Sequence, residues 1–163
     1  MPRTTDSPPE TTRVGDGVAV SRRGDVVMVL WREDARAERM RWLQRELRQL
    51  LDDSSSNAVY LQIVESTSAP PDAETREVAK AIVLELSDRV PLVVTVPLGD
   101  SIWQSVVRTM LRLLLLVSGM GRRHIVVTTF EQACGVIEAR ATDSTPDAAA
   151  LGQTYTRLQA ALD

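Results

Sequence analysis

The chain has 163 residues, of which 44% are hydrophobic and 25% charged, and its formal net charge is −3. Those proportions are typical of an ordinary globular protein, and the length suffices for one domain with a substantial core. The slight negative charge excludes a general electrostatic attraction to nucleic acid. A single cysteine, Cys134, excludes an internal disulfide, and with a single histidine, His124, it predicts no metal site. We expect no cofactor.

The chain begins with a segment that has almost nothing to bury. Residues Met1–Asp16 are rich in proline, threonine and charge, which predicts a disordered tail. They contain no apolar signal-peptide core, so a cytoplasmic location is expected. A β-hairpin is predicted next, with strands Gly17–Arg22 and Val26–Trp31. The second strand, VVMVLW, is apolar on both faces, which favours a central place in the sheet.

The first predicted helix spans Asp34–Leu51, with Asp34 as its N-cap. Trp42 lies away from the apolar stripe of this helix, among charged residues. An outward tryptophan is a candidate contact for a partner protein. The other interpretation is that the ring lies flat on the methylene groups of its neighbours, and the sequence leaves both open.

Strands and helices then alternate. A strand is predicted at Ala58–Val64, a loop at Glu65–Pro71, a helix from Asp72 to about Asp88, and a strand at Pro91–Val96. In a parallel α/β sheet, the loop at the carboxyl end of a strand is where binding sites are built. The loop Glu65–Pro71 is therefore the first place to look for a functional site.

The most apolar stretch of the chain, from Gly99 to Gly121, predicts one long helix. Leu115 and Leu116 interrupt its pattern, because both fall on the polar side beside Arg112. Two adjacent exposed leucines usually mark an interface, so we regard Arg112, Leu115 and Leu116 as candidate partner contacts. The uncharged run is too short to cross a bilayer, and no membrane span is predicted.

The chain continues with a strand at His124–Thr128, a helix from Thr129 to about Ala141 and a linker, Thr142–Pro146. A further helix is predicted at 148–162. It carries a narrow apolar seam at Leu151, Tyr155, Leu158 and Leu162. An isolated helix of this length is marginal in water, so the seam must pack somewhere. It either covers Leu115 and Leu116 or pairs with a second subunit in a homodimer.

Taken together, these elements predict an α/β domain. Strands joined through helices are expected to run parallel, and the antiparallel first strand makes the sheet mixed. We expect a mostly parallel five-stranded sheet with an amino-terminal hairpin, four helices and an extra carboxyl-terminal helix.

From Gly17 to Ala141, about three quarters of the 163 residues, the order and length of the elements resemble the STAS domain of the anti-sigma-factor antagonists. The most suggestive part is the ending, RRHIVVTTFEQACGVIEA at 122–139. The resemblance implies a non-enzymatic switch domain that binds a partner protein. Members of the family carry a phosphorylatable hydroxyl after the third strand. The matching hydroxyls here are Ser66, Thr67 and Ser68, although the family's glycine is missing and Pro70 and Pro71 follow.

The residues themselves indicate no catalysis. No glycine-rich phosphate loop follows a predicted strand, and Cys134 has no assigned histidine partner. We therefore expect no enzyme, and a protein partner whose identity the sequence does not give. The alternative is a carrier or sensor for an apolar, lipid or nucleotide-like molecule, although few aromatic residues are present to stack on a flat ligand.

Overall fold

The computed structural model describes residues 9–51, 57–65, 71–87, 89–99, 105, 109 and 124–163. These form a six-stranded sheet in which the strands lie side by side in chain order. The strands are β1 Glu10–Val14, β2 Val18–Arg23, β3 Val26–Trp31, β4 Val59–Val64, β5 Leu92–Pro97 and β6 His124–Val126. β1, β2 and β3 pair antiparallel, and β3 to β6 pair parallel. The predicted class, a mixed α/β sheet that opens with a hairpin, is therefore confirmed.

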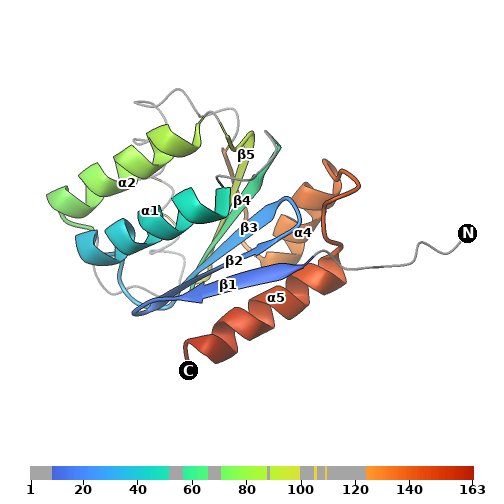
Figure 1. Ribbon diagram of the computed structural model, residues 1–163, viewed down its shortest axis with the longest axis horizontal. Helices are drawn as coiled ribbons and strands as arrows, with labels where there is room; N and C mark the ends of the chain where they lie inside the picture. The colour runs from blue at the N-terminus through green and yellow to red at the C-terminus, as the bar shows by residue number, and fades with distance from the viewer. Residues whose placement is uncertain are drawn as a thin grey trace, which may run out of the picture.

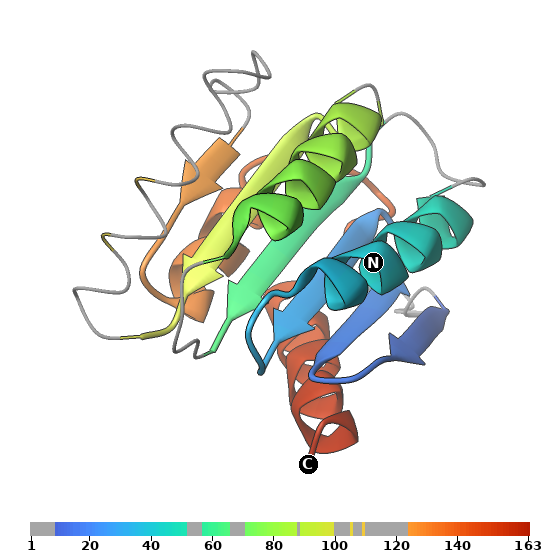
Figure 2. The same cartoon turned by 90° about the vertical axis from the view of Figure 1, so that its left-hand side faces the viewer.

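Helices cover both faces of this sheet (Figure 1, Figure 2). The described helices are α1 Ala37–Leu51, α2 Ala73–Leu86, α4 Phe130–Glu138 and α5 Ala148–Ala161. α1 and α2 pack on one face around Leu43, Leu47 and Ile82, and α4 and α5 pack on the other around Ile137 and Leu158. The sheet thus separates two apolar clusters, and β3 contributes alternate residues to each.

The sheet has six strands where five were expected, because part of the predicted tail is ordered. Glu10–Val14 pairs with β2 along its whole length, from Glu10 opposite Arg23 to Val14 opposite Ala19. The prediction of a disordered tail to Asp16 is therefore wrong for these residues. The physical reason is a turn at 15–17, where Gly17 adopts a positive φ of 68° and the Gly15 N–H bonds the Val18 carbonyl at 2.8 Å. This turn folds the β-branched run back onto β2.

Three of the described helices begin directly after a capping residue. The carboxylates of Asp72 and Asp147 and the hydroxyl of Thr129 each accept a backbone N–H in the first turn of their helix. α1, in contrast, begins at Ala37, three residues after Asp34, the predicted N-cap. The N–H groups of Arg32 and Glu33 both bond the Gly17 carbonyl, at 3.0 and 3.1 Å, which holds the chain in a turn before a helix can start.

The predicted long helix at 99–121 lies almost entirely outside the described residues. Ser105 and Thr109 are described, and both are helical and exposed. The Thr109 hydroxyl donates to the Ser105 carbonyl at 2.9 Å, a bond between residues one helical turn apart.

α5 packs against the sheet of its own chain. Leu151 and Leu158 are buried in the cluster that also contains Met28, Leu30 and Ile137. The segment between α4 and α5 is also attached to the sheet. The Asp25 Oδ2, in the turn between β2 and β3, accepts hydrogen bonds from the hydroxyls of Thr142 (2.9 Å) and Thr145 (2.8 Å). Burial of the seam therefore needs no second subunit, and the segment from Thr142 onward belongs to the same folded body as the sheet.

Candidate functional site

The parallel strands end at one edge of the sheet, and the chain leaving each strand stays bonded to its neighbour. The Glu65 N–H donates to the Trp31 carbonyl at 2.9 Å, and the Leu98 N–H donates to the Val64 carbonyl at 2.7 Å. This carboxyl edge is where open parallel α/β sheets build their sites. Glu65 is thus held in place at the end of β4, immediately before the three hydroxyl residues that the sequence singled out.

The Glu65 carboxylate binds three side chains from different parts of the fold. Its Oε2 accepts Arg32 Nε at 3.0 Å. Its Oε1 accepts the Tyr155 hydroxyl at 3.2 Å and Gln159 Nε2 at 2.8 Å. We call Arg32, Glu65, Tyr155 and Gln159 the Glu65 cluster. Both carboxylate oxygens are used, so the cluster fixes the orientation of Glu65 and joins α5 to the carboxyl edge.

Tyr155 remains a hydrogen-bond donor in this cluster at neutral pH. Burial, together with the nearby Glu65 carboxylate, raises the pKa of Tyr155 to about 12. The Tyr155 ring also stacks on Phe130 of α4, with ring centroids 4.9 Å apart and an angle of 26° between the planes. At the far end of α5, Arg32 forms a second ion pair with Asp163. The cluster is therefore a structural connection between β3, β4, α4 and α5.

Of the seven predicted site residues, the structure describes one. Ser66, Thr67 and Ser68 directly follow Glu65 but lie outside the described residues, as do Arg112, Leu115 and Leu116. Trp42 is described. The predicted roles of all seven residues stay predictions.

Trp42 is half-buried and packs on the cluster beneath α1. The β1–β2 turn covers part of its ring, because a Cβ placed on Gly15 would lie 2.8 Å from the indole Cδ2 and Cε2. The turn is fixed against α1 by Arg39, which bonds the Asp16 carboxylate with Nε at 3.2 Å and NH2 at 2.9 Å. The backbone of the β1–β2 turn thus lies against one face of the Trp42 ring.

A groove of about 340 Å³ runs beside Trp42, between the β1–β2 turn and α1. Its charged lining consists of Asp16, Arg36, Glu38, Arg39, Arg41 and Arg45. We call this the Trp42 groove. Four guanidinium groups face two carboxylates in it, although the whole chain is net negative. The groove is therefore a locally positive surface on an acidic protein.

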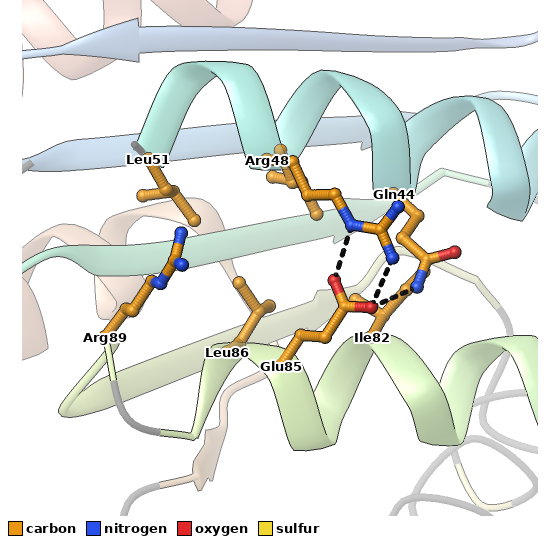
Figure 3. A pocket seen from close by; sticks show the side chains of 8 residues that line it. Gln44, Arg48, Leu51, Ile82, Glu85, Leu86 and Arg89 are labelled. Atoms are coloured by element: carbon orange, nitrogen blue, oxygen red, sulfur yellow. Dashed lines mark hydrogen bonds and ion pairs between the residues drawn. The ribbon is translucent and has the colours of Figure 1, made fainter. Parts of the chain in front are cut away.

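A second hollow, of about 300 Å³, lies between the carboxyl-terminal halves of α1 and α2 (Figure 3). Leucine and isoleucine side chains form its apolar lining, and a polar bridge spans it. Arg48 binds both oxygens of Glu85, with Nε to Oε2 at 3.0 Å and NH2 to Oε1 at 2.6 Å, and Gln44 donates to Oε1 at 2.6 Å. Hydrogen bonding to Arg48 lowers the pKa of Glu85. This bridge joins the two helices across the hollow.

Burial favours the uncharged forms of the cysteine and the histidine. Burial raises the pKa of the Cys134 thiol to about 11, so at neutral pH it is not a thiolate nucleophile. Burial lowers the pKa of His124 to about 4, and its Nε2 lies 2.8 Å from the Thr95 hydroxyl. Among the residues that the structure describes, no cluster of histidine, cysteine and acidic side chains could hold a metal ion. In the same residues, no helix combines the length and apolarity that crossing a membrane requires.

Comparison with known proteins adds no family assignment: no family model matches the chain, and no match is found among curated proteins or solved structures.

Sequence reasoning missed the Glu65 cluster and the Trp42 groove as units. Glu65 was predicted only as the start of a loop, and the residues around Trp42 were described only as charged neighbours. Tyr155 carried a usable signal, because a tyrosine in an otherwise aliphatic seam brings a hydroxyl that needs a partner. The partner itself could not be found, because Glu65 and Tyr155 are 90 positions apart.

Proposed function

We propose that the chain is a STAS-like regulatory module that acts by binding a partner protein and not by catalysing a reaction. The order of the described elements from β2 to α4 supports this. An antiparallel hairpin is followed by α1, β4, α2 and β5, and then by the short β6 and α4. That is the outline that the resemblance implies.

The observation that carries the proposal is the Glu65 cluster at the carboxyl edge. It holds the residue immediately before Ser66, Thr67 and Ser68, the positions that match the family's phosphorylatable turn. It also ties that point to α5 through Tyr155 and Gln159. A change of charge at these three hydroxyl residues would therefore act on α5 through the Glu65 carboxylate.

The proposed switch works through charge. A phosphate on one of the hydroxyl residues adds nearly two negative charges and three strong acceptor oxygens. It repels the Glu65 carboxylate and competes for the Arg32 guanidinium, which prefers to bind phosphate with two hydrogen bonds. Arg32 and Glu65 are both partly exposed, at 26% and 19%, so solvent and a new anion can reach them. If Arg32 bound the phosphate in place of Glu65, the end of α5 would be held less firmly. The surface presented to the partner protein would then change.

The test is a tagged pull-down from the native cell, with the eluate examined intact by native mass spectrometry. We expect a stoichiometric partner protein and phosphate on Ser66, Thr67 or Ser68. The variant Ser66→Ala/Thr67→Ala/Ser68→Ala should lose the phosphate. The matched control is Thr156→Ala, because Thr156 is an exposed residue of α5 whose hydroxyl donates to the Gly152 carbonyl oxygen at 3.0 Å. A bound small molecule without any partner protein would contradict the proposal and favour the carrier.

A further inference from the structure

The arginines of the Trp42 groove fall into two groups. Arg39 is fully used in holding the fold, because it bonds the Asp16 carboxylate and, through NH1 at 2.9 Å, the Asp34 carbonyl. The guanidinium groups of Arg36 and Arg45 are different. Both residues are exposed, and neither side chain makes a hydrogen bond or ion pair within the described part of the chain. Two positive charges at the groove are thus uncompensated.

The remaining charges do not cancel this excess. Arg41 is paired with Glu74 at the start of α2, but the two side chains are 50% and 61% exposed. An exposed pair of this kind contributes little and can exchange partners. Of the two acids in the lining, Asp16 is occupied by Arg39, which leaves Glu38. The groove therefore favours an anionic ligand.

The spacing of the charges indicates the shape of that ligand. The Arg36 carbonyl accepts the first helical N–H, from Met40, so Arg36 lies at the very start of α1. Arg45 is nine positions further on, which corresponds to roughly 13 Å along the helix axis. One small anion would occupy only part of that length. An extended peptide covers the same length with about four residues, at about 3.3 Å per residue.

The position of Trp42 disfavours a nucleotide. Binding of a base requires an open aromatic face for stacking. One face of the indole is already covered by Gly15, and the side chain also packs on the core. What remains is an apolar wall beside the arginines, suited to the aliphatic part of a peptide. Because the side chain already packs on the core and against Gly15, less of its conformational entropy is lost on binding.

From these observations we propose that the Trp42 groove binds an extended acidic segment of a partner protein, with Arg36 and Arg45 as its charge contacts. This inference rests on the proposed function, since it names the chemistry of the partner, but it concerns a different surface from the Glu65 cluster. The net charge of −3 gives the chain no general attraction for an acidic segment, so the attraction must come from locally positive surface such as this groove.

The test uses the purified full chain and a fluorescent synthetic peptide of alternating glutamate and serine. We expect binding by fluorescence anisotropy, weakening as salt is raised, and no binding of the same peptide with glutamine in place of glutamate. Arg36→Gln and Arg45→Gln should each raise the dissociation constant about threefold, and together about tenfold. Arg140→Gln is the matched control, because Arg140 is equally exposed but follows α4 on the other face of the sheet.

Equal binding of the glutamate and glutamine peptides would overturn the proposal, and so would an equal loss with Arg140→Gln. Binding of ATP or inorganic phosphate to the groove without binding of the peptide would also contradict the proposal, and would identify a small anion as the ligand. The Ser66→Ala/Thr67→Ala/Ser68→Ala variant should bind the peptide like the unaltered chain. Absence of phosphorylation at the three hydroxyl residues and absence of peptide binding in the Trp42 groove can therefore be distinguished.

Discussion

Gly15 lies directly against the indole ring of Trp42, so close that a Cβ on Gly15 would be 2.8 Å from two ring carbons. The contact joins the turn between β1 and β2 to the outer side of α1. It explains why position 15 has no side chain, and it gives the amino-terminal strand a point of attachment on the helix layer.

Gly15→Ala should therefore destabilise the protein. The added methyl group forces the turn away from Trp42, at a cost of about 1–3 kcal/mol in the free energy of unfolding. The measurement is a urea unfolding curve. Gly152→Ala is the control, because nothing lies within 4 Å of a Cβ at that helical position. It should raise the stability by about 0.5–1 kcal/mol. The same sign for both variants would show that the contact with Trp42 is not as described.

The bond between Tyr155 and Glu65 can be removed without disturbing the stacking on Phe130. Tyr155→Phe deletes only the hydroxyl, and we expect a loss of about 0.5–1.5 kcal/mol in stability. Hydrogen exchange should show faster opening of the amides in the second half of α5. Exchange that accelerates equally in α2 would mean that the loss is global and that the cluster has no local role.

Asp25 offers a test of what holds the start of α5. The residue is 5% exposed, and the hydroxyls of Thr142 and Thr145 both donate to its Oδ2. Thr142→Val/Thr145→Val leaves a buried carboxylate without these donors, which should cost about 2–3 kcal/mol. In an Asp25→Ala background the same two substitutions should cost far less. A double-mutant cycle measured by chemical unfolding checks this, and additive effects would contradict it.

His124 should make the stability depend on pH. Its pKa is lowered from 6.5 to about 4 in the folded chain, so the unfolded chain binds more protons between these values. The contribution is fully present above pH 6.5 and is lost as the pH falls toward 4, by up to about 3 kcal/mol. His124→Gln should remove this part of the pH dependence. The free energy of unfolding of the unaltered chain and of His124→Gln is measured from pH 7.5 to 4.5. The difference between the two isolates the contribution of His124 from that of the carboxylates. A difference that stays constant with pH would show that His124 ionises equally in both states.

Much of this fold could be predicted, because its signals are local. The continuous apolar run of β3 predicts a central strand, and the capping residues Asp72, Thr129 and Asp147 mark the helices that they begin. β1 was missed because its sequence, ETTRV, has no apolar face. It is stabilised as a strand by pairing with β2 and by the turn against Trp42, and both of these are tertiary interactions.

The candidate sites could be predicted only in part, for the same reason. The carboxyl end of β4 follows from the alternation of strands and helices, so Glu65 and the residues after it could be identified. The partners of Glu65 come from β3 and α5, and no pattern in the sequence joins them. Trp42 was predicted to lie away from the apolar stripe, but it is half-buried on the core cluster, and the glycine that covers its ring comes from another element.

The ion pair between Arg157 and Glu10 joins residues 147 positions apart, and the Arg23 guanidinium bonds the Ala150 carbonyl across 127 positions. Both contacts bring α5 onto the two strands made first. During synthesis, the sheet face that carries Met28 and Leu30 therefore stays uncovered until the residues of α5 have left the ribosome. Exposed apolar sheet in a nascent chain invites aggregation, and a topology dominated by such distant contacts folds slowly. We expect the yield of folded protein in the cell to depend on chaperones that shield this face until α5 arrives.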